Sequence, residues 1–69
     1  MLKMIEVVGT SPLGFTEAVK GAIENLLASG EKIHFFEVFE QRGAVREGKF
    51  KEFQVILRVA VESAGESPK

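Results

Sequence analysis

Side chains suited to covalent chemistry are scarce in this chain. Among its 69 residues there is one histidine, His34, and no cysteine, tyrosine or tryptophan. No serine lies in a recognisable nucleophile motif, and no pair of carboxylates can be assigned to a cleft. An active site needs a nucleophile or base together with a group that orients it, and the sequence offers no such set. We therefore predict a protein that is not an enzyme.

Metal and phosphate sites are also poorly supported. Zinc sites are built from thiolates and imidazoles, so a chain with one histidine and no cysteine is a poor candidate. Glu17, Glu24 and Glu37 offer oxygen ligands for a hard cation at a symmetry axis, but solvated carboxylates or ion pairs are the favoured interpretation. Gly9 and Gly14 precede a predicted helix, yet their spacing fits neither the P-loop nor the dinucleotide-binding motif. We predict no metal ligands and no phosphate loop.

Length and charge narrow the class of protein. The chain is long enough for one domain, and we expect that domain at residues 1–62, followed by a flexible tail at 63–69. Acidic and basic residues are interspersed around a net charge of −1, which does not indicate a nucleic-acid-binding surface. The apolar runs are too short to span a bilayer, and Glu6 interrupts the only candidate secretory signal. We expect a soluble, cytoplasmic protein. A domain this small usually needs further support, and self-association is the remaining source.

The first half of the chain predicts a strand followed by a helix. Residues 2–8 alternate, with Ile5 and Val7 on one face, and indicate a strand. Ser11 before Pro12 is typical of a helix start, and Gly30 is typical of a residue just past a helix end. Between them, apolar residues recur every three or four positions and predict one buried stripe: Phe15, Ala18, Val19, Ala22, Ile23 and Leu26.

The second half predicts two strands, at residues 32–42 and 50–62, joined by a turn with Glu47-Gly48 at its tip. The expected fold is α+β in the order β-α-β-β, with one helix on a three-stranded, mainly antiparallel sheet. A two-residue loop at the tip would fix the register. A bulge near Gly43 would shift it. The predicted pairs are Phe35–Ala60, Phe36–Val59, Glu37–Arg58, Val38–Leu57, Phe39–Ile56, Glu40–Val55 and Gln41–Gln54.

The stretch "KIHFFEVFEQRG" places aromatic side chains on both faces of its strand. Phe35 and Phe36 are adjacent, so they point in opposite directions. We assign Phe36 to the core beneath the helix. Phe35 and Phe39, with Ile56 and Ala60, then form an apolar patch on the other face. Such patches mark partner or ligand surfaces, and copies of the same chain are the simplest cover.

The segments "VVGTSP", "FFEVFEQRG" and "KEFQVILRV" resemble the dodecin family, from about Met4 to about Val61. The resemblance implies the β-α-β-β fold and a hollow homododecamer built from trimers. It also implies a flavin cofactor (riboflavin, FMN or FAD) bound where subunits meet. Some members bind coenzyme A or metal ions as well. The implied function is non-catalytic flavin binding, storage or protection.

The resemblance also implies site residues. Phe35 falls where most members have a tryptophan that stacks on the flavin ring, Gln54 where a glutamine hydrogen-bonds the polar edge of that ring, and Arg42 where an arginine lies near the ligand. Phenylalanine offers less stacking area and is a poor electron donor. Glu62 stands where bacterial members often carry arginine, which disfavours a phosphorylated flavin.

The predicted register places Phe35 and Gln54 on one sheet face, about 20 Å apart along the strand. If both contact one flavin, they must come from different subunits. Two other functions stay open: a dodecin-like shell that holds cations or another small ligand instead of flavin, and an interaction module that recruits a partner protein through the patch.

Overall fold

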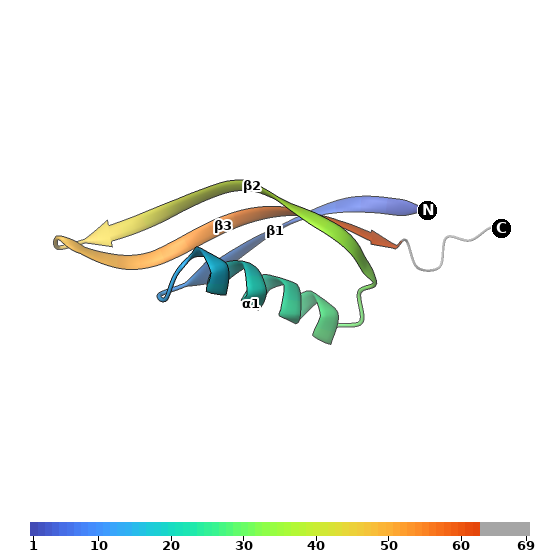
Figure 1. The fold of residues 1–69 in the computed structure, drawn as a ribbon, viewed down its shortest axis with the longest axis horizontal. Coiled ribbons are helices and arrows are strands. Elements are labelled where there is room, and N and C mark those ends of the chain that lie inside the picture. Colours follow the sequence, from blue (N-terminus) through green and yellow to red (C-terminus); the bar gives the residue numbers. More distant parts are fainter. Residues whose placement is uncertain (63–69) are drawn as a thin grey trace.

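The computed structural model describes residues 1–62, and the predicted tail at 63–69 lies outside the described residues. The order is β1 (Leu2–Ser11), α1 (Phe15–Ala28), β2 (Ile33–Arg46) and β3 (Lys49–Glu62). The strands form one sheet in the order β1-β3-β2, with both pairs antiparallel. α1 lies against one face of this sheet (Figure 1). The predicted fold class is confirmed.

The core lies between α1 and the central strand β3. Val55, Leu57, Val59 and Val61 form the helix-facing row of β3 and are fully buried, together with Ala18 of α1. Burying one such aliphatic side chain contributes about 1.5–3 kcal/mol, so this row is a main source of stability in a chain this short. Partly buried residues surround it: Ile5, Val7, Phe15, Val19, Ala22, Ile23, Leu26 and Ile33.

Gly9 allows α1 to pack closely on β1. A Cβ atom at Gly9 would collide with the backbone oxygen of Ala18 and would lie 2.9 Å from the Cβ of Ala22. Separations this short are not tolerated between real side-chain atoms, so any larger residue would push the helix away. The glycine that sequence alone raised as a phosphate-loop candidate therefore has a packing role.

The helix begins later than its capping sequence predicts. Ser11 pairs with Phe53 at the end of β1, so its backbone belongs to the sheet and is not free to cap α1. The Ser11 hydroxyl instead accepts a hydrogen bond from the backbone N–H of Leu13, at 3.0 Å, within the turn. Gly14 occupies the N-cap position, and α1 starts at Phe15.

The end of α1 agrees with the sequence prediction. Gly30 has a φ of 93°, its N–H donates to the Leu27 carbonyl at 3.0 Å, and the N–H of Glu31 donates to the Leu26 carbonyl at 3.1 Å. These two bonds define a Schellman motif, in which glycine is the residue best suited to the left-handed position. α1 is too short to cross a membrane, and no other helix occurs within residues 1–62.

The β2–β3 turn is the predicted two-residue loop. Glu47 and Gly48 have φ values of 54° and 75°, and Arg46 pairs with Lys49 across the loop. Positive φ at both central residues identifies a type I′ turn, whose twist matches that of the flanking strands. The strands run further than predicted, and the tip of the hairpin projects past the start of α1 (Figure 1).

Bulges shift the register of the hairpin and then restore it. Lys51 is an extra residue in β3, so Ala44 pairs with Glu52, and Phe39 is an extra residue in β2, so the original register returns at Val38–Leu57. The predicted pairs at Phe35, Phe36, Glu37 and Val38 are therefore confirmed. Those at Phe39, Glu40 and Gln41 are wrong, because they lie between the two extra residues. In the structure Glu40 pairs with Ile56, Gln41 with Val55 and Arg42 with Gln54.

Candidate functional site

The face of the sheet opposite α1 is open in the single chain. Phe35 and Phe39 of β2 are each 53% exposed there, and Met4 and Val8 of β1 are exposed on the same face. Ala60 is buried on this face, where its register neighbours are Met4 and Phe35. So many exposed apolar side chains on one face of a small domain indicate a surface that binds a partner or a ligand.

A charged row divides this open face. Arg58 of β3 is flanked in register by Glu6 of β1 and Glu37 of β2, which confirms the predicted register of Glu37 and Arg58. The guanidinium carbon of Arg58 lies 4.1 Å from the centre of the Phe39 ring. A cation–π contact of this kind contributes about 0.5–1 kcal/mol at an exposed site. The row separates the end of the face that carries Phe35, Met4 and Ala60 from the end that carries Val8 and Ile56 and, beyond them, Gln54; we call the part around Gln54 the polar end.

The polar end is organised by hydrogen bonds between side chains. Nε of Arg42 donates to Oε1 of Gln54 at 2.7 Å, and Nε2 of Gln54 donates to Oε2 of Glu52 at 2.6 Å. Glu52 and Gln54 are two residues apart on β3 and so share a face. We call Arg42, Gln54 and Glu52 the amide cluster. The bulges create it, because they place Arg42 opposite Gln54 where the unbulged register would place Gln41.

Two of the three predicted site residues thus lie together and the third lies apart. Arg42 contacts Gln54 directly, whereas Phe35 pairs with Ala60, six residues further along β3. At about 3.3 Å per residue this separation is roughly 20 Å. Sequence reasoning missed Glu52. The available signal was that Glu52 lies two residues before Gln54 and so shares its face. That position suggests a role only once the shifted register places Arg42 opposite Gln54.

His34 lies near the Phe35 end of the site. It is an extra residue in β2 between Ile33 and Phe35, and its Nε2 atom lies 3.6 Å from Oε1 of Glu62. Both side chains are about half exposed. This end of the open face therefore carries the carboxylates of Glu37 and Glu62, with the imidazole of His34 beside Glu62.

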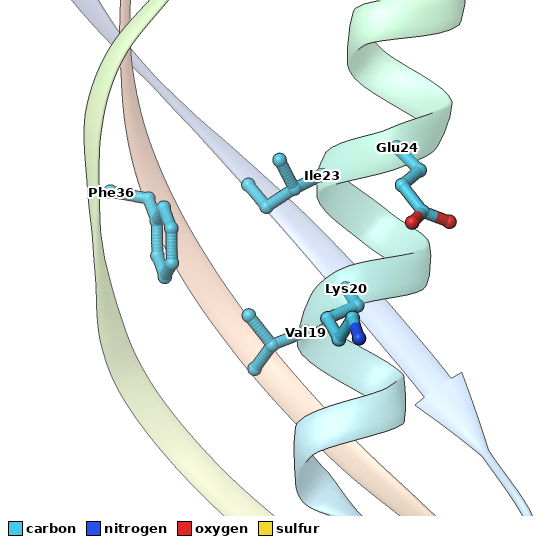
Figure 2. A pocket seen from close by; sticks show the side chains of 5 residues that line it. All are labelled: Val19, Lys20, Ile23, Glu24 and Phe36. Atoms are coloured by element: carbon cyan, nitrogen blue, oxygen red, sulfur yellow. The ribbon is translucent and has the colours of Figure 1, made fainter.

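The helix-facing side of β2 departs from prediction. Phe36 points toward α1, as expected, but is 43% exposed, and Val38 is 45% exposed, so the assignment of Phe36 to the covered core is wrong. The reason is that α1 packs over β1 and β3 and leaves β2 largely uncovered. An apolar groove of about 220 Å³ remains there, lined by Val19, Lys20, Ile23, Glu24 and Phe36 (Figure 2).

Acidic side chains do not gather into a metal site within one chain. Among residues 1–62, no group of three or more histidine, cysteine, aspartate or glutamate side chains is placed to hold a metal ion. Glu17 and Glu24 belong to α1, and Glu37 belongs to β2. A cation site made from these carboxylates would therefore need ligands from more than one copy of the chain.

Comparison with known proteins decides the family. A family model described as Dodecin matches residues 1–64. The chain belongs to the dodecin family. The dodecin of Thermus thermophilus is 39% identical over 57 residues, which cover 83% of each chain.

Solved dodecin structures share the fold. A crystal structure of the T. thermophilus dodecin with tryptophan replaced by phenylalanine has a TM-score of 0.81 at 38% identity, covering 88% of this chain and 91% of that one. Variants of the same dodecin with an arginine replaced by alanine also match, with TM-scores of 0.81 and 0.80. A calcium dodecin from Mycobacterium tuberculosis, described as having a novel calcium-binding site, has a TM-score of 0.84 at 28% identity and covers 100% of this chain and 99% of that one.

Proposed function

We propose that this dodecin binds a flavin between subunits of a homododecameric shell and sequesters it without catalytic turnover. The observation that carries the proposal is the open sheet face, which exposes the Phe35 ring at one end and a hydrogen-bonded Gln54 amide at the other. Stacking would hold the flat faces of the flavin ring, polar contacts would hold its edge, and neighbouring subunits would exclude water. Storage and protection of the flavin would follow from that enclosure, and we assign this role to the cytoplasm.

The chemistry of these residues fits a flavin. The isoalloxazine ring has apolar faces and one edge on which carbonyl groups alternate with an N–H. A phenyl ring offers an offset-stacking partner for such a face. A glutamine amide offers both donors and an acceptor, which is what an edge of this pattern needs. Arg42 adds a fixed positive charge beside the amide, at 2.7 Å.

Spacing along the chain supports the assignment of these positions. In the T. thermophilus variants, the replaced tryptophan precedes the first replaced arginine by seven residues, and that arginine precedes the second by twenty. Phe35, Arg42 and Glu62 are separated by the same seven and twenty residues. The matching intervals support the assignment of Phe35 to the tryptophan position and of Arg42 to that of the first arginine. Glu62 replaces the second arginine with an acid, which favours riboflavin over a phosphorylated flavin.

The geometry also implies how many chains form each site. Phe35 and Gln54 are roughly 20 Å apart on one face, which is longer than a flavin ring system. A single flavin that touches both must therefore lie between two copies. Closed, symmetric homo-oligomers repeat such a shared site at every equivalent interface.

A second candidate function is a shell that holds cations. It is favoured by the close structural match to the calcium dodecin of M. tuberculosis. In this chain the ligands would be the carboxylates of Glu17, Glu24 or Glu37, gathered from several copies around a symmetry axis. This alternative does not need the Phe35 ring or the amide cluster.

Titration of riboflavin into the purified protein tests the proposal. We expect saturable quenching of flavin fluorescence by a particle that elutes as a large assembly. Changing Gln54 to alanine should weaken binding by about 1 kcal/mol, the scale of one lost hydrogen bond. Phe35→Ala should weaken it further, whereas Phe39→Ala, which removes an equally exposed ring elsewhere on the same face, should not.

The outcomes separate the two candidates. An intact large assembly that shows no saturable quenching, but takes up calcium in a calorimetric titration, would reject flavin binding in favour of the cation shell. A particle that remains monomeric at high concentration would reject both, because each needs several copies to complete its site.

A further inference from the structure

The Gln54 amide is held from both ends by partners that cannot exchange roles. Arg42 only donates hydrogen bonds, and the ionised carboxylate of Glu52 only accepts them. With the amide oxygen toward Arg42 and the amide nitrogen toward Glu52, both contacts are satisfied, at 2.7 and 2.6 Å. A half-turn of the amide would set donor against donor and acceptor against acceptor. One orientation is therefore strongly preferred before any ligand binds.

From this arrangement we infer that Glu52, together with Arg42, is a positioning residue that fixes the order in which Gln54 presents its acceptor and its donor to a ligand. The inference rests on the proposed function in one respect, namely that the ligand presents an edge with carbonyl groups and an N–H.

The amide keeps bonding capacity for such a ligand. A glutamine amide has two N–H donors and an oxygen with two lone pairs. The contacts to Arg42 and Glu52 use one donor and one lone pair. One N–H and one lone pair are left, in an order set by the partners. This order matches a ligand edge on which a carbonyl and an N–H stand side by side, as in an imide.

Glu52 is suited to hold the amide in place. It is only partly exposed, as is Gln54, and it lies next to the bulge residue Lys51. Hydrogen bonds that involve an ionised group are shorter and stronger than neutral ones, and both bonds of the cluster are of this kind. Because Gln54 is ordered in advance, the ligand does not have to immobilise it, and that ordering would otherwise reduce affinity.

The orientation can be measured first in the protein without ligand. In ¹⁵N–¹H spectra, the side-chain amide signals of Gln54 should lie away from the positions of a free glutamine amide and should exchange slowly with solvent. Glu52→Ala should move these signals toward the free-amide positions and speed their exchange. Glu37→Ala, which removes a carboxylate on the same face that does not contact Gln54, should leave them unchanged. Unchanged Gln54 signals in Glu52→Ala would overturn the inference, whether or not riboflavin binds.

Ligand selectivity supplies the second measurement. Riboflavin and N3-methylriboflavin differ only at the imide N–H. The ratio of their dissociation constants therefore measures how strongly the site discriminates between the N–H and an N-methyl group. We expect Glu52→Ala to weaken riboflavin binding about three- to tenfold, the cost of ordering one freed side chain, and to bring the ratio toward one. Glu52→Gln should keep most of the selectivity, since its amide oxygen still accepts.

The two failures are distinguishable. If the wild-type protein does not bind riboflavin, the proposed function fails, and the amide signals alone decide whether Glu52 orients Gln54. If riboflavin binds but Glu52→Ala leaves the selectivity ratio at its wild-type value, the positioning role is refuted while the proposed function stands.

Discussion

Mixing two damaged variants should restore flavin sites, because Phe35 and Gln54 are too far apart in one chain to serve the same ligand. Phe35→Ala removes the stacking ring, and burial of such a ring contributes about 1.5–3 kcal/mol. Gln54→Glu removes the amide donor and faces a ligand carbonyl with a carboxylate, a mismatch that costs about 1–3 kcal/mol or more. Each variant alone should therefore bind riboflavin much more weakly than the wild-type protein.

The extent of rescue follows from the geometry. The two positions are six β3 residues apart, which is roughly 20 Å, so under the proposed function each site would take its ring from one chain and its amide from another. In an equal mixture, half of the chains carry Phe35 and the other half carry Gln54. If the chains assemble at random, about one quarter of the sites receive both intact residues from the two neighbours that form an interface.

The assay is a count of bound riboflavin per chain after the two variants have been unfolded together and refolded. Size-exclusion chromatography verifies that the mixture assembles, and preassembled variants mixed without unfolding serve as the control. We expect about one quarter of the wild-type capacity in the refolded mixture and none above background in the control. A refolded assembly of normal size that binds no more riboflavin than the separate variants would show that each site is built within one chain.

Three further predictions concern single positions. Gly9→Ala should lower the free energy of unfolding by about 1–3 kcal/mol at fixed protein concentration, because α1 must move away from β1. Gly21→Ala, which has open space around it, should raise the free energy of unfolding by up to about 1 kcal/mol. Equal denaturation midpoints for the two variants would contradict this account of the β1–α1 contact. Phe35→Trp should tighten riboflavin binding and deepen the quenching of its fluorescence, and a weaker complex in a fluorescence titration would count against stacking at this position. Glu62→Arg should raise affinity for FMN relative to riboflavin, and an unchanged ratio in parallel titrations would mean that the phosphate lies elsewhere.

Alternation and turn chemistry were enough to predict most of the architecture. The row from Phe53 to Val61 in β3 indicates which face is buried, and the two positive φ angles at Glu47 and Gly48 are those expected of the two-residue loop. The bulges were not predictable in the same way. An extra residue such as Lys51 or Phe39 changes which side chains meet without changing composition, and Gly43, the proposed bulge, lies next to the real irregularity between Ala44 and Val45.

In the candidate site, too, some features follow from strand alternation and others depend on the bulges. The face on which Phe35 lies follows from the strand period, and so does its distance from Gln54. The contact between Arg42 and Gln54 does not, because it depends on the shift of one residue that the bulges introduce. Phe36 illustrates a further limit. Alternation predicts the sheet face on which Phe36 lies but does not predict whether α1 covers it. A helix about 10 Å wide can cover only about two strands spaced about 4.8 Å apart.

The strand order has a consequence for how this chain associates. β1 and β2 are both outer strands, so each presents unpaired backbone groups along one side. Regular edges of this kind invite strand-by-strand growth into fibrils. The extra residues at His34 and Phe39 break the regular spacing of the β2 edge, and bulges are one of the devices that prevent such growth. The chain can thus expose an apolar sheet face while its longer edge strand, β2, resists open-ended polymerisation.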